Sequence, residues 1–293
     1  MCLGHGPVHE RIRALDAALA AEPSRAEWWL ERADFHRIDG AYTNALSDLA
    51  AAERHGKALK RLPWVRARVF AEMGRAEEAK GQLDRWLAVE PGHTEALALR
   101  AGLRADSGDA VGAVEDYTAA IRAVEKPAPD LILARARVQR KVGKEGLERA
   151  LVGVEDGIRA LGPLVILQME AAELEEALGR VDAAAARLDC LVRTAVRPES
   201  WRVRKAELLE RAGRAGAAKA EWRQALEHCV ALSPRLRGSR AQQALEGRIR
   251  EKLGPLESAS VDRARTPRGD AADDSAAKTI SQTVPPLRNQ PVP

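Results

Sequence analysis

The chain has 293 residues, of which 31% are charged and only 3% are aromatic, and its formal net charge is +4. So small an excess of positive charge over this length argues against an electrostatic surface for nucleic acids, and the scarcity of aromatic residues argues against base-stacking platforms. No run of 18 apolar residues occurs, so the sequence predicts no transmembrane helix and no membrane insertion.

The N-terminal segment is predicted to contain a disordered start and one helix. Residues 1–8 are expected to be disordered, and Gly6 and Pro7 are expected to prevent a helix that would align the two neighbouring histidines. The segment MCLGHGPVHE has no apolar core and is not a signal peptide, so the chain as written is expected in the cytoplasm. A helix is predicted over residues 9–22. Its sequence matches the second helix of a two-helix unit that recurs later in the chain. The chain as written therefore begins with half a unit, so an upstream signal and a periplasmic or secreted location stay open.

Small residues then recur along the chain at intervals of 34 to 37 residues. Each period carries an alanine, a glycine seven residues later and a second alanine. Glycine tolerates positive φ and ends a helix, and alanines let two helices approach closely. Each period therefore predicts a helix, a turn and an antiparallel second helix. The residues that define these hairpins are Ala33, Gly40, Ala45, Ala67, Gly74, Ala79, Ala101, Gly108, Ala113, Ala136, Gly143, Ala150, Ala172, Gly179, Ala184, Ala206, Gly213 and Ala218.

Six repeats follow from this spacing. They are predicted near residues 26–56, 60–93, 94–127, 129–163, 165–198 and 199–232, so that the repeat domain covers residues 9–232. Repeat four has two extra residues between its two alanines, in the segment VGKEGLERA. They predict a longer turn at Gly143 and a local bend.

The C-terminal part is predicted to hold one more helix and a disordered tail. Residues 233–257 are expected to form a capping helix, with Ser239 at its start and Gly254 and Pro255 at its end. Residues 258–293 lack apolar periodicity and are rich in Ser, Thr, Pro and Asp, which predicts disorder.

Two segments, AEWWLERADFHRIDGAYTNALSDLAAAERHG and MGRAEEAKGQLDRWLAVEPGH, resemble the tetratricopeptide repeat (TPR), a helix–turn–helix unit of 34 residues. The first carries Trp29, Ala33, Gly40, Tyr42 and Ala45 where this family has its pattern. The resemblance implies an all-α, right-handed α-solenoid of about six repeats with an N-terminal half repeat and a C-terminal capping helix. It also implies a non-catalytic scaffold that binds a peptide or a partner helix in the concave groove lined by the first helices.

The alignment with this family implies a groove that is basic in its middle and acidic toward its C-terminal end. The candidate groove residues are Arg37, Trp64, Arg68, Arg137, Arg140, Lys141, Glu173 and Glu207. Such a dipolar groove is expected to orient a peptide of complementary charge. A solvated helix face is the alternative interpretation of the same charges.

A basic residue precedes the first alanine of most repeats, and an acid often follows it 16 residues later, as with Arg32 and Asp48. The recurrence favours structural ion pairs within each hairpin. Arg66 and Arg135 have no acid at this spacing, which makes them the better candidates for free, ligand-binding arginines.

No P-loop, zinc-protease, nucleophile-elbow or dinucleotide-binding motif occurs, so the sequence predicts no enzyme, no cofactor and no metal site. The predicted partner is a protein or peptide and not a nucleic acid. Two alternatives stay open: an accessory subunit of an envelope or secreted system, and an RNA-binding helical repeat. The second is disfavoured because the groove residues change character from repeat to repeat.

Overall fold

The computed structural model describes residues 5–56 and 59–265, which form sixteen α-helices and no β-strand. The helices are α1 (His5–Ala21), α2 (Ala26–Ile38), α3 (Tyr42–His55), α4 (Leu62–Glu72), α5 (Ala76–Val89), α6 (Thr94–Asp106), α7 (Ala110–Arg122), α8 (Pro129–Arg140), α9 (Gly143–Leu161), α10 (Val165–Ala177), α11 (Val181–Thr194), α12 (Glu199–Arg211), α13 (Ala215–Ala231), α14 (Pro234–Arg237), α15 (Arg240–Leu253) and α16 (Pro255–Arg265).

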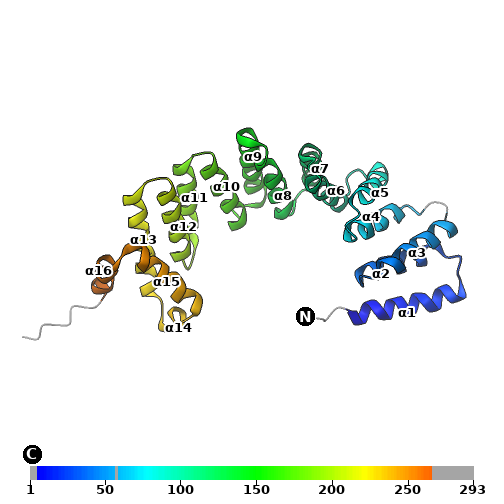
Figure 1. Cartoon of the computed structure of the whole chain (residues 1–293), viewed down its shortest axis with the longest axis horizontal. Coiled ribbons are helices and arrows are strands. Elements are labelled where there is room, and N and C mark those ends of the chain that lie inside the picture. Colours follow the sequence, from blue (N-terminus) through cyan, green and yellow to red (C-terminus); the bar gives the residue numbers. More distant parts are fainter. Residues whose placement is uncertain (1–4, 57–58, 266–293) are drawn as a thin grey trace, which may run out of the picture.

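Six antiparallel helix pairs, from α2 and α3 to α12 and α13, stack side by side into an open arch (Figure 1). The first helix of each pair lies toward the inner side of the arch and the second toward the outer side. Helix α1 packs against α2, and α15 and α16 pack against α13. This architecture confirms the all-α repeat fold that the sequence predicts.

Glycine ends the first helix in five of the six pairs. Gly40 has a φ of 78°, its N–H donates to the carbonyl of Arg37, and the N–H of Ala41 donates to the carbonyl of His36 at 2.8 Å. This is a Schellman motif, which satisfies the last carbonyls of a helix. The same two bonds recur at Gly74, Gly108, Gly179 and Gly213.

Alanine substitutions at two glycines of repeat two test whether the positive φ, and not a lack of room for a side chain, requires glycine in the turn. Gly74 has a φ of 74°, Gly81 lies inside α5, and a Cβ would meet no atom within 4 Å at either site. We expect Gly74→Ala to lower the free energy of unfolding by about 1 kcal/mol, because the left-handed region strains an alanine. We expect Gly81→Ala to raise it by about 0.5–1 kcal/mol, because glycine weakens a helix. Urea denaturation of both variants measures the difference, and equal shifts of one sign would contradict the turn.

The recurring alanines lie where the helices of a pair cross. All twelve have at most 5% of their surface exposed, and bulky side chains pack around them, such as Leu49 beside Ala45 and Leu83 beside Ala67. A methyl group at these positions brings two helix backbones close enough for the larger neighbours to fill the space between the pairs.

Repeat four differs from the prediction of a longer turn at Gly143. Only Lys141 and Val142 separate α8 from α9, whereas three residues separate α2 from α3, so the prediction is wrong. The two extra residues lie within α9, which begins at Gly143 itself, whereas α3 begins two residues after Gly40; α9 has 19 residues against 14 in α3. A Cβ on Gly146 would lie 2.1 Å from the carbonyl oxygen of Gln139, so glycine allows α9 to start this close to the end of α8.

The N-terminal helix begins earlier than the sequence predicts. Helix α1 includes Gly6 and Pro7, so the prediction of disorder is wrong for residues 5–8, while residues 1–4 lie outside the described part of the chain. Proline is tolerated in the first turn of a helix, because the N–H groups there have no partner within the helix.

The C-terminal cap contains three helices in place of the single one predicted for residues 233–257. Ser239 starts α15, and its Oγ accepts from the N–H of Gln242. Gly254 ends α15, but Pro255 then begins α16. The predicted disordered tail is therefore helical up to Arg265, and residues 266–293 lie outside the described residues.

A buried side chain fixes this additional helix. Val261 of α16 is 4% exposed and packs in a cluster with Trp222, Ile249 and Leu253. The Arg250 guanidinium also makes two hydrogen bonds of 2.9 Å to the Asp262 carboxylate, joining α15 to α16. A single valine in a polar segment gives no periodic pattern, so sequence periodicity did not reveal the helix.

Candidate functional site

A row of basic residues on the first helices lies between two rows of carboxylates. Arg32 donates to Asp48 in its own pair at 2.8 and 2.7 Å, and to Asp16 on the preceding helix at 2.6 Å. Hydrogen bonding to Asp48 raises the pKa of the Arg32 guanidinium. The same arrangement recurs at Arg100 with Asp84 and Asp116, and at Lys205 with Asp189 and Glu221. These residues join three consecutive helices and are structural.

Arg66 belongs to the same row but does not have the role predicted for it. Its Nη2 donates to the Glu53 carboxylate at 2.8 Å, and this bond lowers the pKa of Glu53. The prediction that Arg66 is free to bind a ligand is therefore wrong. The partner was missed because it lies 13 residues before Arg66, on the preceding repeat.

Arg37, a predicted groove residue, is buried. Its side chain is 6% exposed, donates to Asp34 at 2.7 Å and pairs with Glu72 of the next repeat. Arg68 lies 3.3 Å from the same Asp34. The assignment of Arg37 to an accessible groove surface is wrong, because neighbouring carboxylates hold its guanidinium between two repeats.

Trp64, the predicted aromatic residue of the groove, also lies in the core. It is 7% exposed, and its ring centroid lies 6.5 Å from that of Trp86 and 4.8 Å from that of His93. The ring packs between α4 and α5 and does not present a stacking surface to a ligand. The prediction of Trp64 as a contact residue is therefore wrong.

The C-terminal part of the inner face does not carry the predicted net acidic charge. Glu173 accepts from Arg140 at 3.5 Å and from Arg204 at 2.9 Å, and Glu207 lies 3.5 Å from Arg248. Arginines of adjacent helices therefore neutralise both acids, and the predicted dipolar groove is wrong.

Two cations at the C-terminal end of α8 remain accessible. Arg137 and Lys141 are exposed and form no ion pair with any described residue. The adjoining α6 has Gly102 on its inner side, and a Cβ there would lie 3.7 Å from the hydroxyl of Tyr117. Burial and the charge of Asp106 raise the pKa of Tyr117, so this hydroxyl is neutral and able to donate a hydrogen bond.

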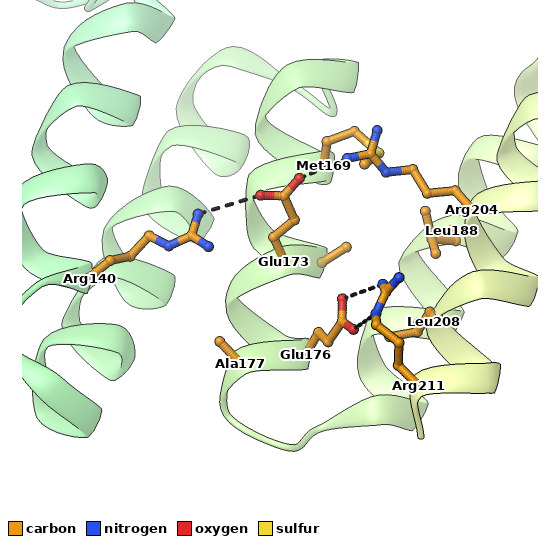
Figure 2. Close-up of a pocket in the computed structure, with 10 residues that line it drawn as sticks. Arg140, Met169, Glu173, Glu176, Ala177, Leu188, Arg204, Leu208 and Arg211 are labelled. Carbon is orange, nitrogen blue, oxygen red and sulfur yellow. Dashed lines mark hydrogen bonds and ion pairs between the residues drawn. The ribbon is translucent and has the colours of Figure 1, made fainter. Parts of the chain in front are cut away.

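A pocket opens between α8, α10 and α12, and Arg140 is its lining residue on α8 (Figure 2). Its volume is about 470 Å³. Met169, Ala172, Ala177, Leu188 and Leu208 supply its apolar lining. The polar lining is a set of ion pairs in which Arg140, Arg204 and Arg211 face the α10 carboxylates Glu173 and Glu176.

The ion pair at the end of this pocket is bidentate. Glu176 accepts from Arg211 Nε at 2.6 Å and from Nη2 at 3.0 Å, which raises the pKa of Arg211. Because both charges are satisfied, the pocket presents mainly apolar surface with a fixed polar edge. Such a surface fits an apolar side chain flanked by backbone polar groups.

A smaller pocket of about 360 Å³ lies on the inner side between α2 and α4. Leu30, Leu59 and Val65 form its apolar part, and Glu27 and Arg61 are among its charged residues. The described chain thus carries one such pocket between α2 and α4 and another between α8, α10 and α12.

The arrangement is similar to that of solved structures. No protein-family model and no curated protein sequence matches the chain. A tetratricopeptide repeat protein from Parabacteroides merdae aligns with a TM-score of 0.50 and 18% identity, over 87% of this chain and 93% of that one. The C-terminal part of a TPR repeat-containing protein from Cytophaga hutchinsonii aligns with a TM-score of 0.53 and 12% identity, over 87% and 94%. This chain has the TPR fold.

The described residues contain neither a membrane-spanning helix nor a metal-binding cluster. No helix among the described residues has the length and hydropathy needed to cross a membrane. Residues 5–56 and 59–265 also bring together no group of three or more side chains suited to hold a metal ion.

Within this TPR solenoid, Arg140 and Glu173 are the predicted groove residues that lie in one pocket. The α12 side of the pocket was missed, although its residues Arg204, Leu208 and Arg211 follow the i, i+4, i+7 spacing of one helix face. That spacing was the available signal.

Proposed function

We propose that this protein is a non-catalytic scaffold whose inner face binds a segment of a partner protein across α8, α10 and α12. The partner's acidic residues lie on Arg137 and Lys141, and an apolar side chain enters the pocket between α10 and α12. The observation that carries the proposal is a pocket lined on α8 by Arg140, with two cations that no described residue neutralises three residues before it and one residue after it.

The charges of the inner face support an acidic partner. Around the pocket, carboxylates and guanidinium groups form ion pairs between helices, as Glu176 does with Arg211. Arg137 and Lys141 stand apart from these pairs on exposed positions one turn apart. Exposed cations steer an acidic ligand and fix its register, while the buried apolar contact supplies most of the affinity.

The proposal is tested with a displayed library of random 12-residue peptides, selected on the whole chain. We expect the selected peptides to combine Asp or Glu with a large aliphatic or aromatic residue. The double variant Arg137→Glu and Lys141→Glu is expected to weaken their binding at least about tenfold, because attraction becomes repulsion. Fluorescence anisotropy at two salt concentrations measures the loss and its screening.

Two further variants separate charge from packing. Arg13→Glu with Arg240→Glu changes the net charge equally, at exposed positions on α1 and α15, and is expected to leave binding unchanged. Ala177→Trp fills the pocket without altering its charges and is expected to abolish binding. Failure to select any peptide, or selected peptides that bind the Arg137 and Lys141 variant as well as the parent, would overturn the proposed function.

A further inference from the structure

Repeat four lacks the carboxylate that other repeats place against their first-helix arginine. Three residues after the second alanine, repeats one, three and six have Asp48, Asp116 and Glu221, whereas repeat four has Gly153. The acid of the preceding helix is missing as well, because Thr118 lies five residues after Ala113, where Asp84 lies five residues after Ala79 in the preceding repeat. Arg66 also has neither acid but pairs with Glu53, so Arg135 is the arginine of this row that forms no ion pair with any described residue.

The Arg135 guanidinium nevertheless points into the space where those acids would lie. A Cβ on Gly153 would be 2.4 Å from its Nη2 and 3.5 Å from its Nε. These are the two nitrogens with which Arg32 and Arg100 bind their aspartates. Arg135 makes one long bond, from Nη1 to the Thr118 hydroxyl at 3.4 Å, and no ion pair with any residue that the structure describes.

A pocket of about 300 Å³ surrounds this nitrogen edge, between α7, α8 and α9. Gly153 and Gly157 line it on the α9 side, and they let Arg135 and Ile132 pack closely there, since a Cβ on Gly157 would lie 2.6 Å from Ile132 Cδ1. Arg122, which is exposed and has no ion pair among the described residues, stands at its edge. The space is thus bounded by helices and open to a small group from outside.

The carboxylates that line the same pocket restrict what can enter. Asp156 acts on Arg135 through its charge at a distance but forms its ion pair with Arg159, and Glu125 is exposed. Two negative charges at the rim disfavour a dianion such as phosphate. A planar carboxylate carries only one negative charge. It can also accept two hydrogen bonds from one guanidinium, as the aspartates do at Arg32 and Arg100.

The protonation equilibrium of Arg135 also differs from that of its counterparts. Burial lowers the pKa of the Arg135 guanidinium, whereas hydrogen bonds donated to aspartates raise the pKa of Arg32 and Arg100. No carboxylate of a described residue offsets the desolvation of this half-buried cation, and an entering carboxylate would accept the hydrogen bonds that Asp48 and Asp116 accept from Arg32 and Arg100.

We propose that the Arg135 pocket binds a carboxylate group that this chain does not supply, held by Arg135 Nε and Nη2 over Gly153. Arg135 and Arg137 are two residues apart, so their side chains leave α8 about 200° from one another. The carboxylate site and the inner face are therefore separate surfaces, and the ligand belongs to a second binding event.

The test follows the arginine Nε–H signals of the ¹⁵N-labelled full chain by NMR during titration with sodium acetate, at constant ionic strength. We expect saturable binding in the millimolar range, with the largest shift at Arg135. Neutral acetamide is expected to give no saturable shift. Shifts that stay linear in acetate, or that are equal for acetamide, would overturn the site.

Two variants and a control assign the binding to this pocket. Gly153→Asp supplies the missing acid from within, and Arg135→Met removes the cation, so each is expected to weaken acetate binding at least about tenfold. Gln82→Asp adds an acid at the same register position in repeat two, where Arg66 already has Glu53, and is expected to change nothing. Full acetate binding by the Gly153→Asp variant would contradict the proposal.

A second titration identifies the source of the carboxylate. N-acetyl-aspartate N-methylamide presents an aspartate side chain with a protein-like backbone attached. Binding of both this compound and acetate supports a carboxylate on a partner protein, and binding of acetate alone supports a free small carboxylate. Binding of neither would overturn the site.

Discussion

The Trp222→Ala variant is expected to lose about 3–5 kcal/mol of unfolding free energy, the range found for truncating a buried tryptophan. Trp222 is 2% exposed and packs with Leu226, Ile249, Leu253 and Val261, so its ring joins the last hairpin to α15 and α16. Removing it leaves a cavity at the junction between the solenoid and its cap. In a repeat protein the end helices depend on this single interface, so their loss exposes the core of the last repeat.

The indole also has a polar contact that alanine removes. Trp222 Nε1 donates to Glu210 Oε1 at 3.0 Å, and the Lys252 ammonium lies 5.9 Å from the ring. The first contact joins α12 to α13, and the second joins α15 to α13. Because Glu210 is about one third exposed, water can satisfy the freed oxygen, so the cavity accounts for most of the expected effect.

Urea denaturation followed by far-ultraviolet circular dichroism measures this effect, and hydrogen exchange locates it. Amides of α15 and α16 are expected to lose protection before those of α2 to α11. Trp28→Ala is the matched control, because Trp28 is half-buried on α2 and lies outside the buried clusters of the described chain. Equal stability losses in the two variants would show that the cap is not held as described.

The second large effect is expected at the buried carboxylate of repeat three. Asp116 is 5% exposed and accepts from Arg100 at 2.8 and 2.6 Å and from Arg104 at 2.9 Å. Asp116→Ala leaves two partly buried guanidinium groups without this acceptor. We expect a loss of about 3–5 kcal/mol, because an uncompensated buried charge costs more than the pair contributes.

Asp182→Ala controls for the loss of a carboxylate as such. Asp182 binds Arg214 through two hydrogen bonds, but its side chain is 84% exposed. Solvent screens such a pair, so no measurable change in the denaturation midpoint is expected. Asp116→Asn gives a second comparison, since it keeps the shape and removes the charge. A midpoint for Asp116→Ala equal to that of Asp182→Ala would contradict a structural role for this row.

The repeat architecture could be predicted because its causes are local in the sequence. A glycine at the end of a first helix adopts a φ that other residues resist, as at Gly40. An alanine at a helix crossing is required by the closeness of two segments only about twelve residues apart, as with Ala33 and Ala45. The pairing of Arg32 with Asp48 also lies within one hairpin. Each of these features repeats, so its period is visible in the sequence.

The groove could not be predicted in the same way, because its chemistry arises between repeats. Arg37 is neutralised by Glu72, 35 residues later, and Glu173 by Arg204, 31 residues later. Family alignment identifies which positions face inward but not which charges cancel one another across the stack. The same alignment predicts that Trp64 faces inward, yet its ring packs against Trp86 and His93. Burying a large aromatic surface is more favourable than leaving it exposed to water.

Helix ends near irregular segments also depended on tertiary packing. Two extra residues beside Gly143 suggested a turn from local propensity, but the close contact of Gly146 with α8 allows α9 to lengthen. In the same way, Val261 makes α16 part of the cap although its sequence is polar. Packing outweighs propensity in both places, because tertiary contacts stabilise most short helices.

The amino-acid sequence by itself determined that the chain is a stack of helical hairpins, since steric demands within each hairpin recur at a fixed period. The tertiary structure decided which charges remain available. Electrostatic pairing depends on distances between residues of different repeats, so only the folded stack distinguishes the neutralised Arg37 and Glu173 from the accessible Arg137 and Lys141 and from Arg135, whose acid is replaced by Gly153.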